Sequence, residues 1–174
     1  STKRNSAFID VADYYFENGD YRKSAQWYDK VEEKNLSRDQ KKRFYFNKGY
    51  TLVQSKKFDE AKPYLNKVSD DPDYGSQAKY YLGYIAYEGD DLEAADELFS
   101  EVQEAPESDD RLSYYQADLN YKLGRFDEAI ELAEKQLESS NRMEQSELNR
   151  VIGQSLFNQG KYDEALPYLQ AYKG

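Results

Sequence analysis

Apolar residues recur along the chain with the period of an amphipathic helix, in a block that repeats five times. Large apolar residues at 21, 58, 92, 126 and 162 mark the blocks, with spacings of 37, 34, 34 and 36 residues. Three positions after each lies Ala or Ser, and seven positions after each lies an apolar residue. These offsets place the side chains on one face of a helix. Each block therefore predicts a helix that begins near its large apolar residue.

A second helix is predicted ahead of each of these positions. A small residue lies nine positions before each large apolar residue: Ala12, Gly49, Gly83, Ala117 and Gly153. A small side chain lets two helix backbones approach closely where they cross. Between the two helices, Gly19, Gly124 and Gly160 supply the left-handed conformation that ends a helix, and Gly89 lies one residue earlier in the third block. The repeating unit is thus a helix–turn–helix.

This unit resembles the tetratricopeptide repeat, a helix–turn–helix of ~34 residues whose copies stack into a superhelix. The third block is the best match, with Tyr-Leu-Gly-Tyr at 81–84, Gly-Asp-Asp-Leu-Glu-Ala-Ala at 89–95, and Phe99. The resemblance covers nearly the whole chain. It implies an all-α superhelix, a solenoid in one array, with the last repeat incomplete. The repeats are expected at about residues 5–38, 42–75, 76–109, 110–143 and 146–174.

Composition removes most enzyme classes. The 174 residues include no Cys and no His, which excludes thiol nucleophiles, imidazole bases and Cys/His zinc sites. A net charge of −10 would repel phosphate backbones, so nucleic acid is not an expected partner. No apolar run reaches the ~18 residues of a membrane span, and no membrane insertion is expected. We predict a non-enzymatic protein without a cofactor or metal.

Acidic side chains are abundant, but their positions favour structural roles. Carboxylate pairs at 59–60, 127–128 and 163–164 fall in the first turn of predicted second helices, where the helix dipole favours negative charge. The acidic cluster at 70–73 lacks the spacing of an EF-hand calcium loop. We interpret it as a turn between repeats.

Aromatic residues make up 16% of the chain, and 18 of them are Tyr. Tyr80, Tyr84 and Tyr87 stand at i, i+4 and i+7 on one face of a predicted first helix. In tetratricopeptide arrays this face lines a concave groove in which partner segments bind, so the resemblance implies an aromatic-lined groove. The alternative is that the rings only pack between neighbouring first helices. The candidate ligand-binding residues are Phe46, Tyr50, Tyr80, Tyr84, Tyr87, Arg111, Tyr114, Asp118, Tyr121, Lys122, Arg150 and Phe157.

The leading hypothesis is a protein-interaction scaffold that holds a peptide or helix of another protein in this groove. One alternative is carbohydrate binding on the tyrosine platform. Another is an architectural role, as a segment of a longer array or by end-to-end stacking or homo-oligomer formation through the last repeat. There Tyr168, Leu169 and Tyr172 are expected to face the place of a further helix. The repeats are similar to those of bacterial envelope scaffolds, and lack of Cys fits cytoplasm and periplasm equally.

Overall fold

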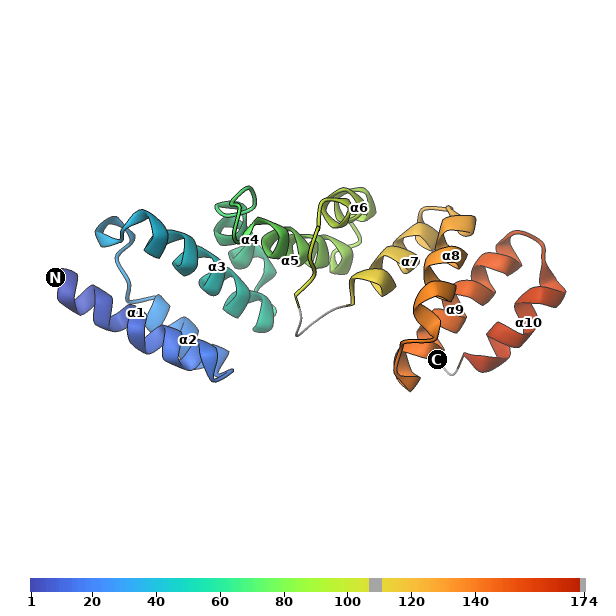
Figure 1. Cartoon of the computed structure of the whole chain (residues 1–174), viewed down its shortest axis with the longest axis horizontal. Helices are drawn as coiled ribbons and strands as arrows, with labels where there is room; N and C mark the ends of the chain where they lie inside the picture. The colour runs from blue at the N-terminus through green and yellow to red at the C-terminus, as the bar shows by residue number, and fades with distance from the viewer. Residues whose placement is uncertain (107–110, 173–174) are drawn as a thin grey trace. The chain divides into compact units, whose positions relative to one another are not determined.

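The computed structural model describes residues 1–106 and 111–172, which form ten α-helices and one short 3-10 turn, with no strand among them (Figure 1). The helices follow one another as pairs, as the repeat predicts. Their bounds are α1 Thr2–Glu17, α2 Tyr21–Tyr28, α3 Arg38–Gln54, α4 Phe58–Asn66, α5 Gly75–Glu88, α6 Leu92–Ser100, α7 Leu112–Lys122, α8 Phe126–Leu137, α9 Arg142–Asn158 and α10 Tyr162–Ala171. The 3-10 turn η1 spans Glu33–Asn35.

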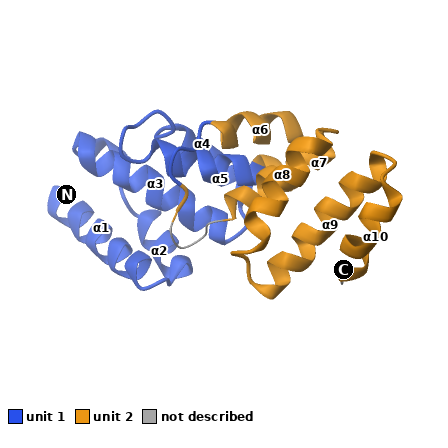
Figure 2. Cartoon of the chain, turned by 45° about the vertical axis from the view of Figure 1, so that its right-hand side comes forward, with its two compact units in different colours: residues 1–85, 101–104 blue, residues 86–100, 105–174 orange. Residues whose placement is uncertain are grey.

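The chain comprises two compact units (Figure 2). Unit 1 contains residues 1–85 and 101–104, and unit 2 contains residues 86–100 and 105–174. Helices α1 to α4 and most of α5 belong to unit 1. Helix α6 to helix α10, together with the last turn of α5, belong to unit 2.

The helix pairs follow the order of the predicted repeats, but four first helices begin earlier than expected. They begin at Thr2 (α1), Arg38 (α3), Gly75 (α5) and Arg142 (α9), against expected starts at 5, 42, 76 and 146. Asn141 caps α9 by accepting a hydrogen bond from the Glu144 backbone N–H, which explains the early start. The expected boundary at 109–110 and the expected end at 174 lie outside the described residues.

The turns inside the helix pairs use a left-handed residue. It is glycine in three pairs: Gly19, Gly124 and Gly160, with φ of 77°, 80° and 79°. In the other two pairs it is Lys56 and Asp90, each with φ of 58°. The third block therefore turns at Asp90, and the role expected for the adjacent Gly89 is wrong.

Small residues mark the helix crossings, as predicted. A Cβ added to Gly49 would lie 2.7 Å from the Leu65 side chain of α4, and one added to Gly153 would lie 2.7 Å from Leu169 of α10. Real Cβ atoms do not approach that closely, so a larger residue at either position would have to displace the leucine side chain.

Each unit contains its own apolar core. In unit 1 a cluster of buried side chains joins α1, α2 and α3: Ile9, Ala12, Tyr28, Leu36 and Phe44. In unit 2 a second cluster joins α7 to α10: Ala117, Ala129, Ala133, Leu148, Val151, Ile152, Leu156 and Ala165. The cores fix the first helices, which carry the candidate site residues.

No helix in the described parts of the chain is both long enough and apolar enough to span a membrane.

Candidate functional site

The candidate residues differ widely in exposure. Phe46, Tyr80 and Asp118 are buried, and Tyr80 is 0% exposed. Lys122 and Phe157 are exposed. The others are half-buried: Tyr50, Tyr84, Tyr87, Arg111, Tyr114, Tyr121 and Arg150. Phe46 and Tyr80 thus contribute to packing and present no open surface to a ligand.

In unit 1 Phe46, Tyr50 and Tyr80 belong to a cluster of rings centred on Tyr50, while Tyr84 meets Phe58 of α4 edge to face at 5.9 Å. The Tyr50 ring meets Phe16 of α1 at 5.4 Å, Tyr21 of α2 at 5.1 Å and Tyr81 of α5 at 5.0 Å between centroids, all edge to face. Phe46 stacks on Tyr50 from the preceding turn of α3, at 6.3 Å. Such edge-to-face pairs stabilise beyond the area they bury. The candidate rings around Tyr50 therefore serve largely to pack α1, α2, α3 and α5 together.

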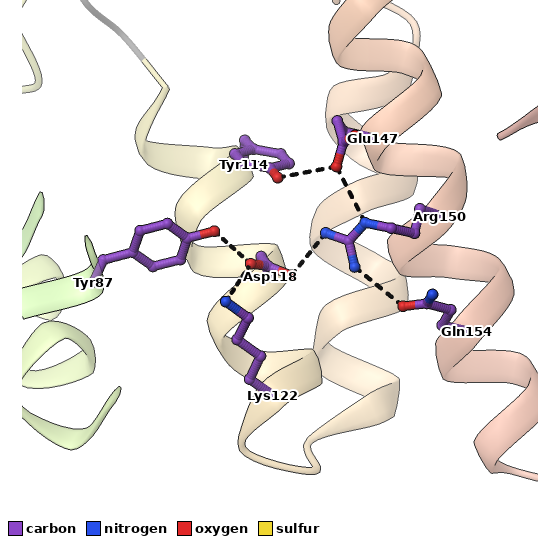
Figure 3. Close-up of polar contacts among 7 residues, drawn as sticks. All are labelled: Tyr87, Tyr114, Asp118, Lys122, Glu147, Arg150 and Gln154. Carbon is purple, nitrogen blue, oxygen red and sulfur yellow. Dashed lines mark hydrogen bonds and ion pairs between the residues drawn. The ribbon is translucent and has the colours of Figure 1, made fainter. Parts of the chain in front are cut away.

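In unit 2 the candidate residues form a polar network around Asp118, a residue that is only 1% exposed (Figure 3). The Tyr87 hydroxyl of α5 donates a short hydrogen bond to Asp118 Oδ2. Lys122 Nζ lies 3.2 Å from the same oxygen, one helical turn along α7. From α9, Arg150 Nη2 donates to Asp118 Oδ1 at 2.9 Å. Side chains of three helices therefore converge on one buried carboxylate.

The guanidinium of Arg150 extends this network along α9. Its Nε donates to Glu147 Oε2 at 3.1 Å and its Nη1 donates to Gln154 Oε1 at 3.1 Å. Tyr114 of α7 donates its hydroxyl proton to Glu147 Oε2 at 3.3 Å. Figure 3 shows these groups linking α7 with α9, so the network joins two neighbouring repeats.

The network shifts the proton affinities of its members. Burial by itself would raise the pKa of Asp118, but the Tyr87 hydroxyl, Arg150 and Lys122 together lower that pKa below its ordinary value. Burial, and then the hydrogen bond to Asp118, raises the pKa of Tyr87. Burial opposes the charge of Arg150, yet the two carboxylates it contacts raise its pKa. Asp118 is thus ionised at neutral pH, and Tyr87 is a neutral donor.

A smaller network in unit 1 uses the same register. Asp13 follows the small residue of α1 just as Asp118 follows that of α7. It accepts a short hydrogen bond from the Tyr28 hydroxyl, and Arg43 Nη2 of the next repeat lies 3.1 Å from its Oδ2. Asn47 Nδ2 donates to Tyr28 at 2.9 Å. The candidate list drawn from the sequence missed this network, although the shared register of the two aspartates was a usable signal.

Sequence reasoning also missed a pocket of about 410 Å³ in unit 1, between α2, α3 and α4. Lys48 lies at its wall, with Nζ 2.9 Å from Asp29 and 4.8 Å from the Tyr64 ring centroid. Lys67, also at the wall, lies 3.9 Å from Glu33. Oppositely charged side chains pair with one another at its wall, and none of the candidate ligand-binding residues lines it.

Among the described residues, no group of three or more acidic side chains is arranged to hold a metal ion. The acidic cluster at 70–73 instead lies in the turn that precedes α5. Asp71 accepts hydrogen bonds from the backbone N–H groups of Asp73 and Tyr74, and it pairs with Lys42 at 2.7 Å. This agrees with its interpretation as a turn.

Comparison with known proteins identifies the repeat. The tetratricopeptide repeat profile matches residues 46–110, 91–144 and 114–174, which is most of the chain. The chain belongs to the tetratricopeptide repeat family. Tetratricopeptide repeat proteins are in general non-enzymatic scaffolds, and membership of the family supports a general protein-interaction role for this chain.

Solved tetratricopeptide repeat structures show the same solenoid fold. MamA AMB-1 is 21% identical with a TM-score of 0.80, covering 99% of this chain and 91% of that one. MamA MSR-1 is 21% identical with a TM-score of 0.76, covering 97% and 94%. The nearly identical TPR-like repeats of a Podosopora anserina protein described as a kinesin light chain are 15% identical, with a TM-score of 0.62 and coverage of 99% and 95%. No curated protein matches the sequence significantly.

Proposed function

We propose that unit 2 binds an extended or helical segment of a partner protein on the surface formed by Tyr87, Tyr114, Tyr121, Lys122 and Arg150, which we term the unit 2 row. Asp118 is buried beneath this row and is proposed to hold Tyr87, Lys122 and Arg150 in place. The observation that carries this proposal is the buried Asp118 network. It holds half-buried phenol rings and two cations in one arrangement before any ligand arrives. Preorganised groups lose little conformational freedom on binding, so their contacts convert efficiently into affinity.

Stability alone is a poor explanation for a carboxylate at this position. Replacing a buried ion pair by apolar groups of similar volume is often neutral or stabilising. The repeat itself does not require a charge there, because Tyr50 occupies the same register in unit 1 and packs against other rings. The polar composition of the unit 2 row therefore favours a binding role.

The charges of the row indicate the kind of partner. Lys122 and Arg150 belong to it, and Arg111 stacks beside it, 4.7 Å from the Tyr114 centroid. Lys122 and Arg150 both pair with Asp118, but Lys122 is exposed, so its ammonium can also reach a carboxylate of a partner. We expect a partner segment that combines aromatic or aliphatic side chains with a carboxylate.

In unit 1 the half-buried Tyr50 and Tyr84 remain proposed partner contacts. Phe46 and Tyr80 are left out of the proposal because they are buried. Phe157 is also left out, because it lies outside the Asp118 network and its ring meets Tyr162 of α10 at 4.9 Å.

A selection experiment tests the unit 2 row and does not require an identified partner. Peptides from a random display library would be selected on the wild-type chain, and their affinities measured by calorimetry. We expect Tyr121→Ala and Lys122→Glu to weaken the selected peptides by about tenfold or more, the loss typical of central interface side chains. The helical signal of both variants should stay close to wild type, because Lys122 is exposed and Tyr121 is only half-buried. Tyr121→Ala should lower the melting temperature to some extent, because its ring packs on the unit 2 core, so binding is compared at a temperature where circular dichroism shows the variant folded.

The matched control is Tyr14→Ala, since Tyr14 is a more exposed tyrosine on α1, in unit 1. Selected peptides that bind all three variants and the wild type equally would contradict the proposal. Calorimetry against a glycan panel covers the carbohydrate alternative. A glycan whose heat of binding is lost with the Tyr121→Ala variant would show that this surface binds a sugar instead of a protein.

A further inference from the structure

A pocket of about 410 Å³ lies between α2, α3 and α4 of unit 1, and we call it the unit 1 pocket. Three consecutive helices of the first two repeats form its walls, so all of these walls lie within the described chain. Ala25 of α2, Leu52 of α3 and Pro63 of α4 give it an apolar side. Its volume lies in the range of about 300–1,000 Å³ that is common for small-molecule sites. The unit 1 pocket is therefore large enough for a small organic molecule.

The corresponding place in the last repeats is filled by side chains. Counted from the large apolar and small residues of each block, Ala25 corresponds to Ile130 of α8, and Lys48 corresponds to Ile152 of α9. Ile152 is 0% exposed, and Ile130 packs on the same buried cluster. Unit 1 thus has a shorter side chain and a lysine where unit 2 has two isoleucines that pack in its core.

The rest of the wall is largely the same in both places. The shared wall positions are Leu52, Lys57, Glu60, Pro63 and Tyr64, which correspond to Leu156, Lys161, Glu164, Pro167 and Tyr168. Tyr168 and Leu169, expected from the sequence to face a further helix, pack on the unit 2 core instead. The open space of unit 1 therefore depends mainly on Ala25 and Lys48. A change at Ala25 tests this space without altering the charges of the wall.

Four of the six charged side chains at the pocket wall are already paired. Lys48 Nζ lies 2.9 Å from Asp29 Oδ1, and Lys67 Nζ lies 3.9 Å from Glu33 Oε2. Glu33 also accepts a hydrogen bond from the Tyr45 hydroxyl at 3.0 Å. The charges within each pair cancel, so these four groups line the pocket without selecting an anion or a cation.

Lys57 and Glu60 are the two charged side chains that remain. Both are exposed, and they lie three positions apart at the start of α4. Among the residues that the structure describes, neither side chain has an ion-pair or hydrogen-bond partner. They present one cation and one carboxylate beside an apolar space. An α-amino acid matches this arrangement, because one carbon atom carries its carboxylate, its ammonium and its side chain.

We propose that the unit 1 pocket binds a free α-amino acid with an apolar side chain. The carboxylate of the ligand pairs with Lys57 and its ammonium pairs with Glu60. Its side chain lies in the space between Ala25, Leu52 and Pro63. The site shares no residue with the unit 2 row, so this proposal does not depend on that one.

The charged pair by itself does not make the site. Lys161 and Glu164 repeat it at the start of α10, but there Ile130 and Ile152 hold the place of Ala25 and Lys48. The proposal therefore requires both the charges and the open space, and each requirement can be removed separately.

Titration of the isotope-labelled chain, followed by the amide signals of its NMR spectrum, tests the ligand class. The probes are L-phenylalanine, L-leucine and L-methionine. We expect saturable shifts within α2, α3 and α4, with a Kd of about 1 mM or tighter for at least one probe, as its small size permits. Phenylalaninamide lacks the carboxylate and 3-phenylpropionate lacks the ammonium, so each should bind about tenfold or more weakly than phenylalanine.

Two variants test the site. Ala25→Ile introduces the side chain of Ile130 and should fill the space, and Lys57→Gln removes the cation; each should weaken binding about tenfold or more. Gln26→Ile is the control for the first, because Gln26 is an exposed neighbour on α2 that does not line the pocket. Lys161→Gln is the control for the second, at the same register. Circular dichroism would verify that all four variants are folded.

Three results would overturn the proposal. One is the absence of a saturable shift with every probe at about 10 mM, well above the expected Kd. Another is equal binding to the wild type and to Ala25→Ile, which would place the ligand elsewhere. The third is binding of 3-phenylpropionate as tight as that of phenylalanine, because the pocket would then select a carboxylate alone.

Discussion

Tyr50 in unit 1 and Asp118 in unit 2 occupy the same place in the repeat, directly after the small residue at which paired helices cross. Tyr50 is surrounded by the rings of Phe16, Tyr21 and Tyr81. Asp118 is surrounded by a phenol, an ammonium and a guanidinium. The fold accepts either solution, so the register position determines where a side chain lies but not its chemistry. What differs between the units is the surface that each can offer to a ligand.

The largest effect is expected from removing the carboxylate of unit 2. Asp118→Ala leaves the largely buried Arg150 without its main acceptor, and breaking a buried pair on one side costs about 3–5 kcal/mol. Urea denaturation followed by circular dichroism measures this loss. Glu134→Ala, an exposed acid on α8, is the control and should change stability by less than about 0.5 kcal/mol. A loss below about 1 kcal/mol for Asp118→Ala would show that the network is weaker than its geometry indicates.

The matching change in unit 1 is Tyr50→Ala. It removes edge-to-face contacts to three helices, but Tyr50 is only half-buried, so we expect a loss of about 2–3 kcal/mol, below that of a fully buried aromatic residue. Trp27, the one tryptophan of the chain, lies in unit 1, so its fluorescence reports the unfolding of that unit. A free energy of unfolding equal to that of the wild type, measured by this fluorescence, would mean that the ring cluster contributes little to stability.

A smaller effect is expected from Lys122→Met, which keeps the aliphatic stem. Lys122 is exposed, and such ion pairs contribute less than about 1 kcal/mol and are screened by salt. Denaturation at low and high salt should show a cost that disappears at high salt. A cost that persists would indicate that the ammonium acts mainly through the face of the Tyr87 ring, 4.8 Å away.

The smallest expected effect concerns how the free energy of unfolding depends on pH. Because Tyr87, Arg150 and Lys122 lower the pKa of Asp118, its contribution to stability is present above the ordinary pKa and is lost as the pH falls through the lowered one. The free energy of unfolding of wild type should therefore fall more steeply below about pH 4 than that of Asp118→Asn, in which this group does not titrate. Parallel curves for the two proteins would contradict the ionised state of Asp118.

Much of the fold could be predicted from the sequence, because the signals are local. The large apolar residues, the small crossing residues and the glycine turns lie within one repeat, and they locate all ten helices of the described chain. Asp90 shows the limit even here. Its left-handed turn follows a glycine that a residue-type rule would have chosen instead.

The candidate site was less predictable because it depends on neighbouring repeats. Tyr80 and Tyr84 lie one turn apart on the same face of α5, yet Tyr80 is fully buried and Tyr84 only partly. The helical period assigns a residue to a face but does not say which part of that face another helix covers. Likewise, Asp118 and Arg150 are 32 residues apart, and their pairing follows from the packing of α7 beside α9.

The turns at Lys56 and Asp90 offer a practical route to experiments on fragile variants. Both residues adopt a backbone conformation, φ 58°, that costs a residue with a Cβ roughly 1 kcal/mol or more relative to glycine. We expect Lys56→Gly and Asp90→Gly each to raise the free energy of unfolding by about 1 kcal/mol, as urea denaturation would measure. Neither position belongs to the unit 2 row or lines the unit 1 pocket. A chain carrying both changes should be more stable. Destabilising substitutions such as Asp118→Ala could then be introduced into a chain that remains folded, so that their effect on binding can be measured.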